Sequence, residues 1–179
     1  MPKVLIHTLG CKVNQYESEA ILEQFLENGY TISNDQYADV IIINSCTVTA
    51  ESDRKTRQLL HRTRRENPNA VIVLTGCMVQ AFSEKSAELI DADILIGNTE
   101  TNLIFNKATT FLNNGIANKT VLPHSKTEDY CSLTIKNFSE RTRAFMKIED
   151  GCDRYCTYCI IPFARGRIRS REISSIKEE

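Results

Sequence analysis

Short runs of β-branched and aliphatic residues alternate along the chain with segments whose apolar positions recur at helical spacing. Four of these runs are predicted to be strands, over residues 3–9, 40–45, 71–75 and 94–97. Helices are predicted over 14–29, 52–66, 80–90 and 99–113, and a short edge strand over 120–122. This alternation predicts an α/β fold with a parallel, doubly wound sheet.

The first predicted helix carries signals at both of its ends. Asn14 is the expected N-cap, with Glu17 three residues further on as in a capping box, and Gly29 is the expected C-cap. Its apolar stripe consists of Ile21, Leu22, Phe25 and Leu26. The helix is therefore expected to pack one face on the sheet.

The pattern changes after Leu122, where the chain turns polar and loses its period. Further on, 144–148 is predicted to be a new strand, followed by a long loop to Arg169 and by a helix that opens at Ser170. One strand and half a helix cannot bury a core of their own. We therefore expect an amino-terminal domain, a linker and the incomplete start of a second domain, over 1–122, 123–140 and 141–179.

The composition is that of an ordinary globular protein, because 41% of the 179 residues are hydrophobic and 25% are charged. It excludes intrinsic disorder, collagen and a coiled coil. The apolar runs are too short to span a bilayer, and the first ten residues do not resemble a signal peptide. We therefore expect a cytoplasmic protein that does not contact a membrane.

Two basic stretches stand out against the net charge of -1. Residues 54–65 contain six Arg or Lys and no acid, and residues 141–171 contain eight basic against three acidic side chains. Both are compatible with an anionic partner such as RNA, although a charged run can equally be a solvated face. The candidate phosphate contacts of the second stretch are Arg165, Arg167, Arg169 and Arg171.

The seven cysteines are the candidates for chemistry, because thiols stay reduced in the cytoplasm. The sharpest spacing is Cys152-x3-Cys156-x2-Cys159. A structural zinc site would need a fourth ligand, and the nearest candidates, His124 and Cys131, are remote in sequence. Three thiolates can instead hold three irons of a cubane cluster and leave the fourth iron open. Zinc or simply reduced thiols remain the alternatives.

The stretch CDRYCTYC over 152–159, after a predicted strand, resembles the signature of radical S-adenosylmethionine (SAM) enzymes. The resemblance implies a 4Fe-4S cluster on Cys152, Cys156 and Cys159 whose open iron binds SAM and cleaves it reductively to a deoxyadenosyl radical. It also implies that residues 141–179 begin a partial (β/α) barrel. Tyr158 is a candidate neighbour of the SAM adenine, or packs beneath the cluster loop.

The other patterned cysteines, Cys11, Cys46 and Cys77, each come just past the end of a predicted parallel strand. Such strand ends share one edge of the sheet, where open α/β folds place their ligands. Gly10 and Gly76 would let the backbone approach an inorganic group closely. The alternative is that each cysteine is a small, inert hydrophobic residue at the end of a buried strand.

The motifs around these cysteines resemble the three cysteine motifs of the radical SAM methylthiotransferase family: TLGCKVNQYESE over 8–19, NSCTVT over 44–49 and TGC over 75–77. The resemblance implies a second 4Fe-4S cluster on Cys11, Cys46 and Cys77. It covers almost the whole chain, in the order of that family. Cys131 matches no motif and is expected to be an unligated thiol.

Among the subfamilies, KVNQY over 12–16 and CIIPFARG over 159–166 look most like the MtaB type. That type adds a methylthio group to C2 of N6-threonylcarbamoyladenosine next to the tRNA anticodon, at position 37. The MiaB type, which acts on isopentenyladenosine, is the alternative. The resemblance implies the tRNA anticodon stem-loop as a partner, an electron donor such as flavodoxin or ferredoxin, SAM as a cosubstrate, and a monomer.

Two rival functions stay open at this point. One is a non-enzymatic RNA-binding α/β module with a structural metal, and the other is a radical SAM enzyme whose second cluster only relays electrons. Because most of the barrel is missing from the sequence, we expect a transferase fragment that is inactive alone.

Overall fold

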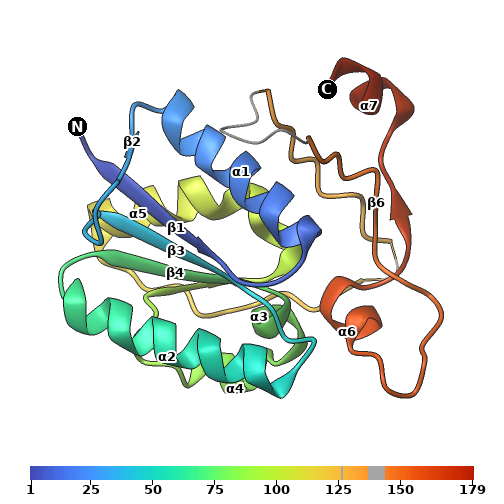
Figure 1. Cartoon of the computed structure of the whole chain (residues 1–179), viewed down its shortest axis with the longest axis horizontal. Coiled ribbons are helices and arrows are strands. Elements are labelled where there is room, and N and C mark those ends of the chain that lie inside the picture. Colours follow the sequence, from blue (N-terminus) through green and yellow to red (C-terminus); the bar gives the residue numbers. More distant parts are fainter. Residues whose placement is uncertain (126, 137–143) are drawn as a thin grey trace.

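The computed structural model describes residues 1–125, 127–136 and 144–179, and its centre is one parallel sheet (Figure 1). The strands follow the order β2-β1-β3-β4-β5, and all four pairings are parallel. Their bounds are β1 Lys3–Thr8, β2 Thr31–Ile32, β3 Val40–Ser45, β4 Val71–Gly76 and β5 Ile94–Ile96. The predicted α/β fold with a parallel, doubly wound sheet is confirmed.

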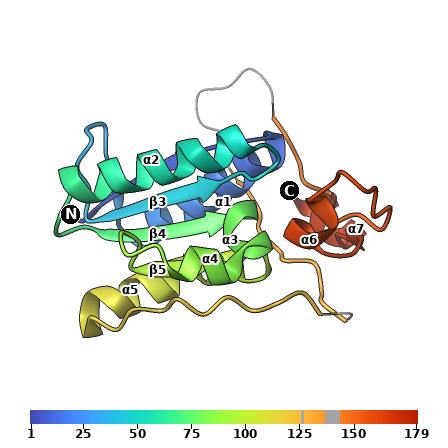
Figure 2. The same cartoon turned by 90° about the horizontal axis from the view of Figure 1, so that it is seen from below.

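Helices cover both faces of the sheet (Figure 2). On one face lie α1 (Lys12–Glu27) and α5 (Ile104–Asn114), and on the other lie α2 (Ala50–Glu66), α3 (Cys77–Ala81) and α4 (Ser83–Ala87). The 3-10 turn η1 (Asn98–Leu103) leads into α5. No helix in the described part of the chain is long and apolar enough to cross a membrane.

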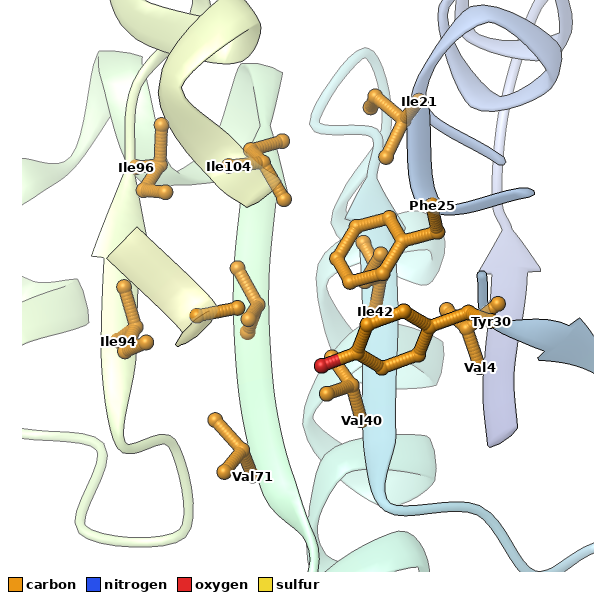
Figure 3. Close-up of a cluster of buried hydrophobic side chains, with 12 residues drawn as sticks. Val4, Ile21, Phe25, Tyr30, Val40, Ile42, Val71, Ile94, Ile96 and Ile104 are labelled. Atoms are coloured by element: carbon orange, nitrogen blue, oxygen red, sulfur yellow. The ribbon is translucent and has the colours of Figure 1, made fainter. Parts of the chain in front are cut away.

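The core consists of two apolar layers, one under each helical face. Phe25 and Tyr30 meet edge to face, with ring centroids 5.1 Å apart, and lie over Val40 and Ile42 (Figure 3). Every residue of β3 and of β4 is buried, which explains why these strands lack a polar alternation in the sequence.

Several predicted elements differ from the observed ones. The two-residue strand β2 was not predicted, because so short a segment carries no period. The predicted edge strand at 120–122 is wrong, since the chain there makes only a single bridge, between Ile94 and Asn118. The predicted helix over 80–90 is two short helices, because Phe82 takes a non-helical backbone conformation between them.

Part of the predicted linker packs on the first domain. Leu133 and Ile135 are buried against Tyr16 and Ala20 of α1, and the Tyr16 hydroxyl donates to the Leu133 carbonyl at 2.7 Å. The boundary at 140 and 141 lies outside the described residues, which omit 126 and 137–143. The division into domains stays a prediction.

The strand predicted over 144–148 is wrong. The strand in this region is β6 (Glu149–Asp150), which pairs antiparallel with β7 (Arg169–Ser170). β7 pairs only with these two residues, and no other described strand pairs with 144–148. The predicted loop to Arg169 also contains a helix, α6 (Ile161–Arg165), and the last helix is α7 (Ile173–Glu178). Helix α6 lies beyond the carboxyl ends of the sheet strands (Figures 1 and 2).

A buried ion network joins this last segment to the first domain. Glu17 of α1 accepts from Arg165 Nη1 at 2.7 Å and Nη2 at 3.1 Å, and from Lys147 Nζ at 2.7 Å. Asp150 also contacts Lys147, at 2.5 Å, and Arg165, at 3.2 Å. All four side chains are less than a tenth exposed. Ion pairs, and not apolar side chains, therefore make this buried contact between the last segment and the first domain.

The cations decide the protonation state of Glu17. Burial alone would raise the pKa of this carboxyl, but the Arg165 guanidinium and the Lys147 ammonium outweigh burial and hold its pKa at about 2. Glu17 is therefore ionised over the whole physiological range.

We expect Leu133→Ala to lower the free energy of unfolding by about 2–5 kcal/mol, because it opens a cavity against α1. Urea denaturation measures the loss. Thr134→Ala, at the exposed neighbouring position, is the control and should leave the midpoint unchanged. Equal stability of the two variants would contradict the packing of this segment.

We expect acid to weaken the network only below pH 4.5. The pKa of Glu17 is lower in the folded chain than its usual value of 4.5, so its contribution is complete above pH 4.5 and is lost as the pH falls toward 2. The difference corresponds to about 3 kcal/mol. Glu17→Gln should lower stability at pH 7 and flatten the dependence of stability on pH in that window.

Urea midpoints measured from pH 7 to pH 2 check this expectation. Glu51→Gln is the control, because Glu51 pairs with Arg54 on the exposed face of α2 and should leave both the midpoint and its pH dependence as they are. A Glu17→Gln variant with the parent's pH profile would show that the network does not stabilise the fold.

Candidate metal centre

Three cysteines follow neighbouring strands at one edge of the sheet. Thr8, Asn44 and Thr75 lie side by side in the registers of β1, β3 and β4. Cys11 comes three residues after this row, and Cys46 and Cys77 come two residues after it. The chain reverses its direction of winding between β1 and β3, and open α/β sheets bind ligands at such a point. The fold therefore brings the three predicted residues to one place.

Glycines let the loops that carry these cysteines approach one another. A Cβ on Gly10, whose φ is +121°, would lie 2.8 Å from the Cys46 Cβ and 3.1 Å from its Sγ. A Cβ on Gly76, with a φ of +97°, would lie 2.4 Å from the Ser45 carbonyl oxygen. Any larger residue would push the loops after β1 and β4 away from Cys46.

The three thiols differ in exposure. Cys11 is exposed, whereas Cys46 and Cys77 are buried. Burial raises the pKa of the Cys77 thiol, and the nearby Arg165 guanidinium offsets only part of the rise. Cys77 is therefore a neutral thiol in the metal-free chain, and a metal that binds it has to displace its proton.

Asn14 does not cap α1, so the predicted N-cap and its capping box are wrong. The N-cap is Cys11, and Asn14 lies fully buried in the first turn. Its Nδ2 donates to the carbonyls of Leu9, at 3.2 Å, and Ser45, at 2.9 Å. Its Oδ1, the acceptor that an N-cap would offer to the helix end, accepts instead from Arg165 Nη2 at 3.1 Å. Asn14 thus ties the loop after β1 to the end of β3.

Asn98 occupies the corresponding place beside Cys77. Its Nδ2 lies 3.7 Å from the Cys77 Sγ and donates to the Ala164 carbonyl at 2.7 Å. Its Oδ1, and the buried hydroxyls of Thr47 and Thr75, have no hydrogen-bond partner among the described residues. Buried polar atoms without partners are expected where a polar group has still to bind.

The donor set at this edge consists of three thiols, which is the ligand chemistry of an iron–sulfur cluster. Among the described residues, no group of three or more cysteine, histidine or acidic side chains is close enough to enclose one metal ion. A cubane instead presents separate irons to separate thiolates, so its ligands need not converge on one point. That Cys11, Cys46 and Cys77 hold a cluster stays a prediction.

The second group of cysteines lies on the loop between β6 and α6. The Cys152 backbone N–H donates to the Gly166 carbonyl at 3.0 Å, and the Cys159 N–H donates to the Cys156 carbonyl at 2.9 Å. Cys156 is exposed, and Cys152 and Cys159 are half-buried. The loop is thus closed at its base, and of its three cysteines only Cys156 is exposed. Their role as ligands also stays a prediction.

Tyr158 does not pack beneath this loop, because it is 90% exposed. The packing contact comes from Tyr155, whose ring meets Phe163 edge to face at 6.1 Å. A place for Tyr158 beside the SAM adenine remains a prediction.

Three of the four arginines predicted to contact phosphate are paired inside the molecule. Arg165 and Arg171 are buried and bind Glu17 and Glu179, and Arg169 pairs with Glu128. Only Arg167 of this set is exposed. Phosphate contact and a solvated face were the two alternatives for these arginines, and both need an exposed side chain, so neither holds for the other three.

Helix α2 also pairs part of its charge. Arg54 binds Glu51 at 2.7 Å, Arg62 binds Glu66 at 2.9 Å, and Arg64 binds Asp93 at 2.5 Å. These acids lie outside the basic stretch, which is why the sequence window did not contain them. Among the described arginines of α2, the exposed ones for which the structure shows no ion pair are Arg57 and Arg65.

The sequence analysis missed the buried charges of the site. Glu17 lies four residues before Ile21 and eight before Phe25, so it continues the apolar stripe of α1. A carboxylate on such a stripe indicates a buried cation as its partner. Nothing in the sequence identifies that cation as Arg165.

Comparison with known proteins adds the family. A family model described as uncharacterized protein family UPF0004 matches residues 3–97. The chain is 41% identical to the threonylcarbamoyladenosine tRNA methylthiotransferase MtaB of Bacillus subtilis, over 96% of this chain and 38% of that protein. It is 40% identical to the protein of the same name from Thermotoga maritima, over 100% of this chain and 40% of that protein.

A second kind of relative is the tRNA-2-methylthio-N(6)-dimethylallyladenosine synthase of Methylacidiphilum infernorum, which is 34% identical over 100% of this chain and 40% of that protein. The chain thus spans about two fifths of the length of these relatives. The family model covers more than half of the chain, from the start of β1 to the end of β5. The protein therefore belongs to the UPF0004 family.

Proposed function

We propose that this chain is the cluster-bearing part of a tRNA methylthiotransferase that uses radical SAM chemistry. Its product is the 2-methylthio form of N6-threonylcarbamoyladenosine at position 37, next to the anticodon. The observation that carries the proposal is the meeting of Cys11, Cys46 and Cys77 at the winding reversal of the sheet, with the Cys152 to Cys159 loop docked beyond the same edge.

The names of the relatives support the choice of substrate. Those at 40–41% identity are named for threonylcarbamoyladenosine, and the relative named for dimethylallyladenosine is 34% identical. Other relatives named for threonylcarbamoyladenosine are also 34% identical, so the support for this substrate over the MiaB-type alternative comes from the two relatives at 40–41%.

Each group of cysteines has a separate task in this proposal. Cys152, Cys156 and Cys159 hold one 4Fe-4S cluster, and Cys11, Cys46 and Cys77 hold the other. When bound, the two clusters supply SAM cleavage and the sulfur donor, chemistry that acid–base side chains cannot perform on an inert C–H bond. The chain contributes thiolates, glycine loops that admit an inorganic group, and buried walls that exclude water around Cys46 and Cys77.

The partners follow from the same chemistry. The tRNA anticodon stem-loop brings the adenosine, a donor such as flavodoxin or ferredoxin brings the electron, and SAM brings the methyl group. We place the reaction in the cytoplasm, where tRNA and reduced thiols are found, and we propose that the protein works as a monomer.

Iron content tests the proposal. Anaerobic reconstitution of the parent chain should give about eight irons and eight sulfides, which is the content of two cubanes. Cys11→Ala, Cys46→Ala and Cys77→Ala should each retain about four irons, because the other group of cysteines is untouched.

Cys131→Ala is the matched control, since this thiol contacts Thr101 and lies in neither group. It should keep the iron content of the parent. A chain that binds zinc and stays colourless would instead support a structural metal in a non-enzymatic RNA-binding module.

Helix α2 provides a test of the tRNA partner. The helix begins four residues after Cys46, so Arg57 lies about 10 Å along it from its start and Arg65 about 22 Å. If the substrate approaches the cysteine edge, Arg57→Glu should weaken tRNA binding several-fold and reduce its salt dependence by about one phosphate contact. Arg65→Glu should weaken binding less.

The two variants carry the same change on the same helix and differ in their distance from the cysteines. Filter binding at several salt concentrations compares them. Unchanged binding in both variants would mean that α2 is a solvated face, and equal losses would mean that only its overall charge matters.

A further inference from the structure

Arg165 lies between the two groups of cysteines. It ends helix α6, which begins two residues after Cys159, and α6 packs on α3, which begins at Cys77. Ala164 of α6 is fully buried, and Arg165 is 5% exposed. Because solvent does not screen the Arg165 guanidinium, its positive charge acts on the buried groups around it.

Two asparagine side chains connect the end of α6 to the first group of cysteines. The Asn14 Oδ1 accepts from Arg165 Nη2 at 3.1 Å and from the Cys11 Sγ at 3.3 Å. Asn98 donates to the Ala164 carbonyl and touches the Cys77 Sγ. Cys11 and Cys77 are thus each one side chain away from α6.

The charges around Arg165 balance. Glu17 and Asp150 carry two negative charges and Lys147 and Arg165 two positive ones, all of them buried. Next to them are Arg169, 3.8 Å from Asp150, and its partner Glu128. Removing one member leaves one uncompensated charge in a medium that screens it poorly.

We propose that Arg165 is a positioning residue that sets the charge environment of the cluster on Cys11, Cys46 and Cys77, and that it acts together with Glu17. This inference rests on the proposed function, since it assumes that the cluster binds there. The reduction potential of an iron–sulfur cluster follows the net charge and hydrogen bonding around it. Arg165, which follows the Cys152 to Cys159 loop, thus influences the reduction potential of the cluster on Cys11, Cys46 and Cys77.

The two members of the pair predict shifts of opposite sign. Reduction adds an electron, so the extra negative charge left by Arg165→Gln should make reduction less favourable. Glu17→Gln leaves an extra positive charge and should make reduction more favourable. Each change is expected to be on the order of tenfold in the reduction equilibrium, about 59 mV for a one-electron couple.

The experiment uses the 179-residue chain with Cys152, Cys156 and Cys159 all replaced by Ala, so that only the first cluster remains. After anaerobic reconstitution, iron per chain is counted and the midpoint potential is measured by redox titration. Arg165→Gln, Glu17→Gln and Arg165→Lys are compared in this background. Arg165→Lys keeps the charge and should stay near the potential of the background chain.

Opposite shifts with recovery in Arg165→Lys support the inference. Unchanged potentials, or shifts of the same sign, overturn it while leaving the cluster and the proposed function in place. If Arg165→Gln fails to hold iron, the other two variants test the inference. It then requires a Glu17→Gln potential above that of the background chain and an Arg165→Lys potential close to it. A background chain that binds no iron overturns the proposed function and this inference with it.

Discussion

The structure depends on one buried carboxylate. Glu17 sits on the sheet-facing side of α1, where an unpaired charge would cost several kcal/mol. The charge is tolerated because Arg165 and Lys147, which lie more than a hundred positions later in the chain, donate hydrogen bonds of 2.7–3.1 Å to it. A buried ion network adds little to stability compared with an apolar contact of the same size, but it accepts only one arrangement of its members. It therefore fixes where α6 lies against the first domain.

The sheet supplies the second constraint. Strands β3 and β4 are buried on both faces, so the chain can vary only in the loops at the strand ends. Both strands end at the edge of the sheet that carries the cysteines. At that edge the backbone itself has to come close, which is why Gly76 approaches the Ser45 carbonyl more closely than any side chain would allow. In the proposed function, the three thiolates are thus positioned by loops at the ends of strands that are buried on both faces, in agreement with the general placement of ligands in open α/β folds.

Local patterns were sufficient to predict the strands with strong apolar runs, the helices α1 and α2, and the meeting of three cysteines at one edge. They failed where a long-range contact decides the local structure. Asn14 and Glu17 have the spacing of a capping box, but the first binds the loop carbonyls of Leu9 and Ser45 and the second binds Arg165. The run 144–148 has strand-forming residues, but no strand in the described part of the chain pairs with it. Alternate arginines after Cys159 look solvated until their buried acidic partners are known.

A neutral ion network between two cysteine groups also answers a physical difficulty of the site. In the proposed function, thiolates and a cluster bring negative charge into a place where Cys46 and Cys77 are only 6% and 3% exposed. Water cannot compensate that charge, so fixed groups of the protein must. Arg165 is close enough to oppose the rise that burial causes in the pKa of Cys77, and Asn14 and Asn98 direct amide groups to the same two loops. Because Glu17 binds the Arg165 guanidinium bidentately, that charge is already fixed in position in the metal-free chain, and the cost of organising it falls on folding rather than on the proposed cluster binding.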